Sequence, residues 1–399
     1  MHSVTIPIAD PGDLPRYFRG ESDVAWLRNH DGMVGLGVAA RHEGPPGSWW
    51  EEFAAGLEVD NELPDTFGTG PLAFTSLAFD PEHTAEASVI TVPRLIVGRR
   101  RGKCWLTLLS DHGDVPRLPE LVGAPAAPAD PSCQWLLPPA QWKAAVAEAV
   151  SRIGDELTKV VLARAVRVAT AADPAWLVRW LAEQYPTCWT YHNSGLVGAS
   201  PELLVRREHG LVTSRVLAGT IRRDGDEELD LKLAHALARS SKNLVEHELA
   251  VESVAAALES FATGMNVPER PFVLELPNVL HLASDITAVV RPEATALRVA
   301  AALHPTAAVC GTPTALARET IAELECLDRG RYSGPVGWTD ANGDGEFAIA
   351  LRCGKLDSTG VVLYAGCGIV AESDPEEEFA ETEAKLLPML QALGLNPSS

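Results

Sequence analysis

From residue 158 onward the chain alternates two hydrophobic patterns. Six runs rich in β-branched or aromatic residues and bounded by turn residues predict strands. They read "KVVLARAVRVAT", "TCWTYHNSGLVGAS", "GLVTSRVLAGTIRR", "HLASDITAVV", "EFAIALRCGKL" and "GVVLYAGCGIV". Apolar residues at helical spacing predict helices near 227–261, 292–303, 313–325 and 375–393, and another in "PPAQWKAAVAEAVSRIGDEL". Because several strands follow one another without a helix between them, we predict antiparallel pairing and an α+β fold.

The first 135 residues have a different pattern of hydrophobic and turn residues. Residues 1–135 alternate short strand-like runs, such as "RLIVGRR" and "KCWLTLLSD", with frequent Pro and Gly. The Ala- and Pro-rich stretch 121–133 is the best candidate for a surface connection. No linker is long and polar enough to separate independent domains. We therefore expect one large domain, with 1–135 as a variable N-terminal part and 136–399 as its principal region.

Composition limits the class of function. The chain of 399 residues is 46% hydrophobic and carries a formal net charge of −21, which disfavours binding to nucleic acid or to anionic lipid. Its seven cysteines are scattered without CxxC spacing, so we expect a reducing cytoplasm rather than disulfides or a zinc site. The N-terminus has no signal-peptide pattern, and no run is long enough to span a membrane.

Lysine is rare in this chain, which has seven lysines against 26 arginines. Lys159 nevertheless stands at the head of the apolar run "KVVLARAV". A lysine can lose its proton and act as a base, whereas an arginine effectively cannot. The alternative is a solubilising charge at a strand edge. The residue alone leaves both interpretations open.

Two short motifs resemble ligand sites, but each lacks a residue or a helix that its site would need. "DANGDGEF" at 340–347 begins like a calcium loop, but Leu351 stands where the bidentate Glu should be, so a hairpin turn is predicted. "GCGIVA" at 366–371 fits a dinucleotide fingerprint, but "ESDP" follows where a helix should already have begun. Paired glycines at a strand end still allow a ligand to approach the backbone closely.

Two predicted helices carry acidic residues of uncertain purpose. In "SDPEEEFAETEAKLLPML", Glu378, Glu381 and Lys385 share one face, which is either a solvated surface or a carboxylate pair for a divalent cation. In "SSKNLVEHELAVESV", Glu248 falls at the edge of the apolar stripe and Glu246 points away from it. Periodicity alone would make Glu248 the unusual acid.

Taken in order, nine segments resemble the chorismate-utilising enzymes, and among them the isochorismate synthases. They are "KVVLAR", "ASPELLVRR", "VLAGTIRR", "SKNLVEHELAV", "LHPTAAVCGTP", "YSGPVGW", "FAIALRCGKL", "AGCGIV" and "EFAETEAKL", and they span residues from about 155 to 395. The resemblance implies one α+β domain of two large antiparallel sheets flanked by helices. It also implies Mg²⁺-dependent isomerisation of chorismate to isochorismate, carried out by the region 136–399.

The resemblance assigns roles to the acids and to the rare lysine. Lys159 matches the base that activates water for attack at C2, and Glu202 matches the acid that protonates the departing C4 hydroxyl. Glu246 and Glu381 match the Mg²⁺ ligands, with Glu378 as a second carboxylate on the last helix. The resemblance therefore favours Glu246 over Glu248 as the metal ligand. The lysine at position 159 suggests water rather than ammonia as the nucleophile.

The remaining matched positions hold the substrate. Arg352 and Lys385, with the backbone amides at Gly219 and Gly366, match the groups that bind the two carboxylates of chorismate. His304 of "LHPT" matches a residue that lines the ring site. For a chain of net charge −21, a cation and a few placed basic groups are a sensible way to accept a dianion.

Two rival functions stay open. Salicylate synthases resemble the chain almost as closely and continue from isochorismate by eliminating pyruvate, although His304 favours the simple isomerase. A non-catalytic binder of an aromatic dicarboxylate is the alternative of a different class. Asn243 departs from the resemblance, since some relatives have an acid there. The product would enter menaquinone, siderophore or salicylate synthesis, and the resemblance suggests a monomer.

Overall fold

The fold is described in a computed structural model, which covers residues 1–276 and 279–395. Its strands form one hydrogen-bonded network in which the pairs are antiparallel except β1 with β4. They are β1 (His2–Pro7), β2 (Val24–Arg28), β3 (Asp31–Glu43), β4 (Glu58–Asn61), β5 (Leu72–Ser76), β6 (Val89–Arg100), β7 (Lys103–Ser110), β8 (Ser132–Trp135), β9 (Lys159–Ala169), β10 (Trp189–Asn193), β11 (Leu196–Ser200), β12 (Leu203–Glu208), β13 (Leu211–Arg222), β14 (Ala262–Asn266), β15 (Phe272–Glu275), β16 (Val279–Val290), β17 (Gly311–Thr312), β18 (Pro335–Asp340), β19 (Gly345–Ile349), β20 (Cys353–Asp357) and β21 (Gly360–Ile369).

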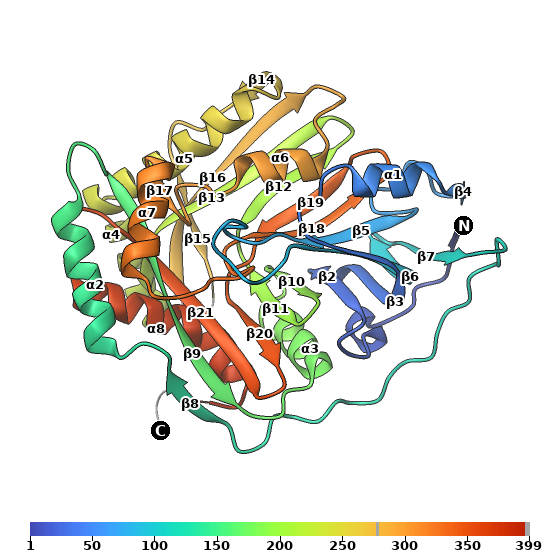
Figure 1. The fold of residues 1–399 in the computed structure, drawn as a ribbon, viewed down its shortest axis with the longest axis horizontal. Helices are drawn as coiled ribbons and strands as arrows, with labels where there is room; N and C mark the ends of the chain where they lie inside the picture. The colour runs from blue at the N-terminus through green and yellow to red at the C-terminus, as the bar shows by residue number, and fades with distance from the viewer. Residues whose placement is uncertain (277–278, 396–399) are drawn as a thin grey trace.

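Helices surround this network, and the predicted α+β class is confirmed (Figure 1). They are η1 (Leu14–Tyr17), α1 (Trp49–Ala55), α2 (Pro139–Arg152), α3 (Pro174–Gln184), α4 (Glu227–Leu237), α5 (Ser241–Glu259), α6 (Ala296–Leu303), α7 (Thr314–Leu324) and α8 (Pro375–Ala392). The two sheets that the resemblance implies are joined here, because β5 pairs with β18 and β2 pairs with β10. The N-terminal strands thus share hydrogen bonds with later ones, while the proposed division at residue 135 stays a prediction.

Strand β9 lies in the interior of the fold. It pairs with β21 along most of its length and contacts α2 and α7, which lie together at the left of Figure 1. Eight consecutive residues from Lys159 onward are buried, which explains the almost uninterrupted apolar run "KVVLARAV". A charged residue at the start of this strand is therefore enclosed with it. The solubilising interpretation of Lys159 is wrong.

The helix predicted over 227–261 is two helices. α4 ends at Leu237, and α5 begins after Ser240, whose hydroxyl accepts a hydrogen bond from the backbone N–H of Asn243. One continuous helix was predicted across this break, and the position of the apolar stripe assigned on α5 was wrong. Glu248 is exposed, whereas Glu246 precedes the buried His247.

Other local predictions are confirmed. "DANGDGEF" forms the turn between β18 and β19, which pair as a hairpin. β21 runs through both glycines of "GCGIVA", and α8 begins only at Pro375, with Asp374 accepting hydrogen bonds from two backbone N–H groups of the first turn. Between β7 and β8 a long segment without regular structure follows the outer edge of the molecule (Figure 1). Over the described residues, none of the helices has the length and apolar character needed to cross a membrane.

Candidate active site

A cavity between the central strands collects six of the residues that the sequence singled out. Its wall is built from β13, β16, β21, α5, α8 and the segments before β12 and β20. The predicted residues that line it are Glu202, Gly219, Glu246, Arg352, Gly366 and Lys385. They come from positions as far apart as 202 and 385, so only the tertiary fold brings them together.

Lys159 lies behind this wall rather than on it. Its side chain is fully buried, and Nζ lies 3.1 Å from Glu246 Oε1. The angle is not that of a hydrogen bond, and Nζ has no hydrogen-bond partner within the described part of the chain. An amine held this way is in ionic contact with one acid and still has protons, or a lone pair, available to another group.

Glycine makes this contact possible. A Cβ at Gly368 would lie 2.4 Å from Glu246 Oε1 and 2.7 Å from Lys159 Cε, distances that real side chains do not occupy. Gly368 stands opposite Val161 in the β21–β9 pairing. The second glycine of "GCGIVA" is therefore needed because two charged side chains meet above it.

Glu202 is a buried acid whose surroundings favour the uncharged form of its carboxyl. It lies immediately before β12, and burial raises the pKa of its carboxyl to about 8, against the lowering effects of the Leu217 N–H and of Lys159. The carboxyl group is therefore mostly protonated at neutral pH. A protonated carboxyl in a cavity can donate a proton, which is what a general acid must do.

Two cations face the cavity with defined partners. Arg352, in a left-handed backbone conformation with φ 49°, donates from Nη2 to His281 Nε2 at 3.1 Å. Lys385 Nζ donates to the Gly366 carbonyl oxygen at 2.9 Å and lies 2.5 Å from Glu381 Oε1. A fixed guanidinium and an ammonium group in one cavity suit a ligand that carries carboxylates.

The glycines at 219 and 366 permit close approach of chain to chain. Gly219 has φ +78° at an irregularity in the β13–β16 register, and a Cβ there would lie 3.0 Å from Asn243 Cβ. A Cβ at Gly366 would lie 3.1 Å from the Leu162 carbonyl oxygen. Both positions leave the backbone uncovered at the cavity wall.

A second cavity adjoins the first and holds the other acids. The two share Thr220, Glu246 and Gly368, and the second is also lined by Glu378 and Glu381. Burial, with repulsion from Glu378 and Glu246, raises the pKa of Glu381 although Lys385 opposes this shift. Repulsion between neighbouring carboxylates is the electrostatic signature of a site that a cation would stabilise.

The donor set offers carboxylates, which are ligands that Mg²⁺ prefers, although each of them also faces a lysine. Glu246, Glu378 and Glu381 each face a lysine, the second through Lys242 at 2.7 Å. Within the described ranges, the three do not bring ligand atoms within 4.8 Å of one another; the group that does is Asp80, Glu82 and His83 on a surface loop. Mg²⁺ commonly binds one or two carboxylates and completes its shell with water and substrate oxygens, so a site here does not need all three; the Mg²⁺ site stays a prediction.

The structure does not bring His304 to the cavity. Its Nε2 donates to the Phe79 carbonyl oxygen at 2.8 Å, and its ring packs edge-on against the Phe79 ring. Burial lowers the pKa of His304 to about 4, so the imidazole is neutral. The role predicted for it against the substrate ring has no support in this geometry.

Sequence reasoning missed His281 and Tyr332, which both line the cavity. Because Arg352 donates to His281 Nε2, the proton of this imidazole is on Nδ1, which donates to Thr220 Oγ1 at 3.0 Å. Tyr332 stacks on Tyr364 with ring centroids 5.0 Å apart. The signal for His281 was present, as a histidine at a buried position of an apolar strand, but no partner could be named from the sequence.

Fold and site together define the class, and the comparison with known families agrees. Residues 47–394 match the family model described as chorismate binding enzyme, and the chain belongs to this family. The resemblance inferred from the nine segments is thus confirmed.

Individual relatives are more specific. Isochorismate synthase DhbC of Bacillus subtilis is 42% identical over 274 residues, which cover 65% of this chain and 69% of that one. Isochorismate synthase MenF of the same organism is 32% identical over 381 residues, covering 86% and 80%. The structure of MenF, the menaquinone-specific isochorismate synthase from Escherichia coli, superposes with a TM-score of 0.80 at 27% identity, covering 98% of this chain and 94% of that one.

The contact over Gly368 generates a prediction about stability. Gly368→Ala should lower the free energy of unfolding by about 1–3 kcal/mol, because the added methyl group must displace Glu246 or Lys159 in a packed interior. Gly264→Ala, on exposed β14 with nothing within 4 Å of the added Cβ, is the control and should change stability by less than about 1 kcal/mol. Chemical denaturation measures both; equal effects of the two substitutions would contradict the crowding described here.

Proposed function

We propose that the protein is an isomerase that converts chorismate to isochorismate with bound Mg²⁺. The observation that carries the proposal is one cavity lined by the protonated buried acid Glu202, by Arg352 and Lys385, and by Glu246, whose carboxylate contacts the buried Lys159 behind the wall. Family membership and relatives named isochorismate synthase support the choice of substrate and product.

The reaction needs one base and one acid. Lys159 Nζ takes a proton from water as the water oxygen bonds to C2 of the ring. The ring double bonds shift and the C4–O bond breaks, while Glu202 gives its proton to the departing hydroxyl. One water enters and one leaves. Return of a proton from Lys159 to Glu202 resets the pair, so the reaction runs in either direction.

Substrate orientation falls to the cationic wall. Arg352 and Lys385 hold the carboxylates, and His281 fixes the guanidinium of Arg352 by accepting one of its N–H groups. Glu246 and Glu381, with Glu378 beside them, would hold the Mg²⁺. When bound, the cation supplies positive charge that neutralises a substrate carboxylate.

The proposal extends to the setting of the enzyme. Its product would enter menaquinone synthesis or siderophore and salicylate synthesis; one solved relative is named menaquinone-specific, and a relative from Pseudomonas aeruginosa is named for salicylate biosynthesis. A cytoplasmic monomer remains our expectation. It rests on the sequence and the resemblance.

The identity of the product is tested directly. Incubation of the purified protein with chorismate and Mg²⁺ should give a mixture of chorismate and isochorismate with the enolpyruvyl ether intact. Chromatography follows both compounds, while a pyruvate assay and salicylate fluorescence follow elimination. Pyruvate in step with growing salicylate would make the protein a salicylate synthase, and no turnover at all would favour the non-catalytic binder.

Removal of the base should abolish catalysis. Lys159→Gln should lower kcat by a factor of roughly 10² to 10⁴, the usual worth of a positioned general base. Because Lys159 is fully buried, its substitution disturbs packing as well, and the melting temperature must be measured alongside. Lys232→Gln, at an exposed lysine of α4, is the control and should leave kcat unchanged. Retention of most activity in folded Lys159→Gln would remove the lysine from the chemistry.

The metal site predicts a ranking of glutamates. Chelation with EDTA should stop turnover and Mg²⁺ should restore it. Glu246→Ala should raise the Mg²⁺ concentration for half-maximal activity at least about tenfold, whereas Glu248→Ala, two residues along the same helix and exposed, should leave it unchanged. Equal Mg²⁺ requirements in the two variants would show that α5 does not contribute a metal ligand.

Glu202 predicts the alkaline limb of the pH profile. Its raised pKa means that the acid form is present below pH about 8 and is lost above it. In the forward direction kcat/KM should therefore fall above pH about 8, by a factor of about ten per pH unit. A profile of kcat/KM against pH from about 6 to about 9.5 checks this, because it extends well above the pKa of Glu202. A profile without a decline would mean that Glu202 is not the proton donor.

A further inference from the structure

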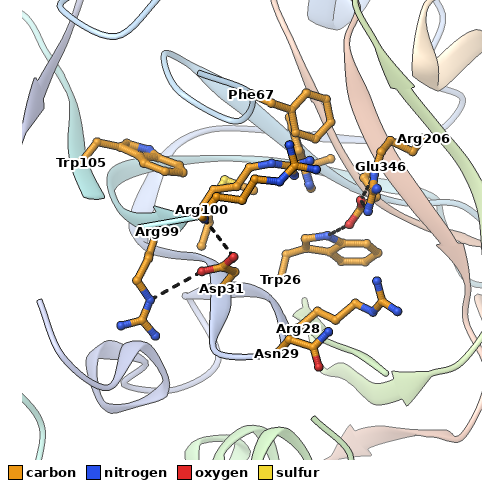
Figure 2. Close-up of a pocket in the computed structure, with 14 residues that line it drawn as sticks. Trp26, Arg28, Asn29, Asp31, Phe67, Arg99, Arg100, Trp105, Arg206 and Glu346 are labelled. Atoms are coloured by element: carbon orange, nitrogen blue, oxygen red, sulfur yellow. Dashed lines mark hydrogen bonds and ion pairs between the residues drawn. The ribbon is translucent and has the colours of Figure 1, made fainter. Parts of the chain in front are cut away.

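The N-terminal part of the chain contacts the later strands through side chains as well as through strand pairing. In the cavity of Figure 2, Trp26 of β2 donates from Nε1 to Glu346 Oε1 at 2.8 Å, and Arg206 binds the same carboxylate. None of the residues that line this cavity lines the proposed active site. The loop between β5 and β6, residues 77–88, differs, because it contacts a segment that does line the site.

The loop 77–88 binds both ends of the segment 330–335. The backbone N–H of Phe79 donates to the Gly330 carbonyl oxygen at 2.9 Å. The N–H of Leu77 donates to the Pro335 carbonyl oxygen at 2.8 Å. A Cβ at Gly334 would lie 2.1 Å from the Leu77 carbonyl oxygen, so the two stretches of backbone are in close contact. The segment 330–335 is thus attached to the N-terminal part of the chain along its whole length.

Glu86, on the same loop, binds the middle of this segment. Its Oε1 accepts hydrogen bonds from Arg331 Nε at 2.7 Å and from Lys355 Nζ at 2.6 Å. The Arg331 side chain is 1% exposed, so Glu86 supplies the carboxylate that a buried guanidinium needs. Burial acts to raise the pKa of the Glu86 carboxyl, but Arg331 and Lys355 outweigh burial and the pKa is lowered. The carboxyl group is therefore charged.

Arg331 connects Glu86 to the wall of the cavity. It stands directly before Tyr332 and Ser333, which line the proposed active site. Its terminal nitrogens donate to the carbonyl oxygens of Asn193 and Ser194, in the turn between β10 and β11. One guanidinium thus joins the loop 77–88, the segment 330–335 and this turn.

Tyr332 is the side chain through which these contacts reach the site. Its hydroxyl oxygen lies 3.2 Å from the position that a Cβ at Gly366 would take, so it lies against the cavity wall. Its ring stacks on Tyr364, and stacking alone permits one ring to slide over the other. The next residue, Ser333, has φ 63°, a conformation that a residue other than glycine keeps when its surroundings fix it. The place of Tyr332 therefore depends on what holds the segment 330–335.

We propose that Glu86 is a positioning residue of the active site, which holds Tyr332 at the cavity wall through Arg331. The inference rests on the proposed function, since it takes the cavity lined by Tyr332 as the place where the substrate reacts. It gives the region 1–135 a part in the reaction without a group that touches the substrate. Release of Arg331 would let Tyr332 shift, and a shifted wall no longer aligns the substrate with the acid and the base.

Glu86→Gln tests this role, because it removes the charge and keeps the size of the side chain. It should lower kcat/KM for chorismate about ten- to a hundredfold, the usual scale for misplacement caused by a change away from the reacting atoms. Glu82→Gln, at an exposed glutamate of the same loop, removes the same charge and should leave kcat/KM unchanged. A kcat/KM of wild-type size in Glu86→Gln would overturn the proposal.

A double-mutant cycle with Tyr332→Phe separates positioning from a general loss of structure. If Glu86 acts through the Tyr332 hydroxyl, adding Glu86→Gln to Tyr332→Phe should lower kcat/KM less than about twofold further. A merely structural role would make the two losses additive, and additivity would refute the positioning role. Glu86→Asp keeps the charge that Arg331 needs while shortening its reach. It replaces Glu86→Gln in the cycle if that variant fails to fold, and the same non-additivity is expected.

A measurement without turnover separates this inference from the proposed function. Hydrogen exchange of the backbone amides in 77–79 and 331–334, followed by mass spectrometry, should be faster in Glu86→Gln than in the wild type and unchanged in Glu82→Gln. If the wild-type protein binds chorismate without converting it, the proposed function fails, and chorismate affinity measured by calorimetry replaces kcat/KM in the same cycle. Unchanged exchange in Glu86→Gln would contradict the role of Glu86 in either case.

Discussion

The candidate site depends on the burial of one ammonium group beside one carboxylate. β9 is covered on both faces, so the Lys159 side chain at its first position is buried and its charge must be compensated inside the protein. Withdrawing a charge from water costs several kcal/mol, and removal of either partner would leave the other uncompensated. Glu246 provides the compensation, the cap at Ser240 sets where α5 begins, and Gly368 provides the space for the two groups to meet.

Charge compensation by lysine also applies to the neighbouring glutamates. Three of the seven lysines of the chain face three glutamates here, as Lys159 with Glu246, Lys242 with Glu378 and Lys385 with Glu381. The scarcity of lysine elsewhere makes this concentration informative, because a compact ammonium group can lose a proton or release its partner to a metal. An acidic protein thereby has a local region in which an anionic substrate and a divalent cation are both acceptable.

Glu202 differs from the other glutamates of the site, because it is not paired with a lysine in the described structure. No lysine lies within ion-pair distance of its carboxyl in the described structure, and burial keeps it protonated at neutral pH. The site thus places an acid that holds its proton near an ion pair between Lys159 and Glu246. The protonated state of Glu202 needs a packed interior, since in water its carboxyl would be charged.

The sequence by itself determined the elements whose signals are local. Apolar residues at helical spacing predicted α8, the "NGDG" turn predicted the β18–β19 hairpin, and the apolar run after Lys159 predicted β9. The ordered series of segments was enough to identify the family, because its information is spread over some 240 residues rather than one motif.

Only the tertiary structure decided which side chains meet. It broke the predicted long helix at Ser240, which moved Glu246 inward and left Glu248 in solvent. It turned His304 toward Phe79 and placed His281 against Arg352. These outcomes depend on contacts between residues far apart in the chain, and a pattern with a period of two or 3.6 residues carries no information about them.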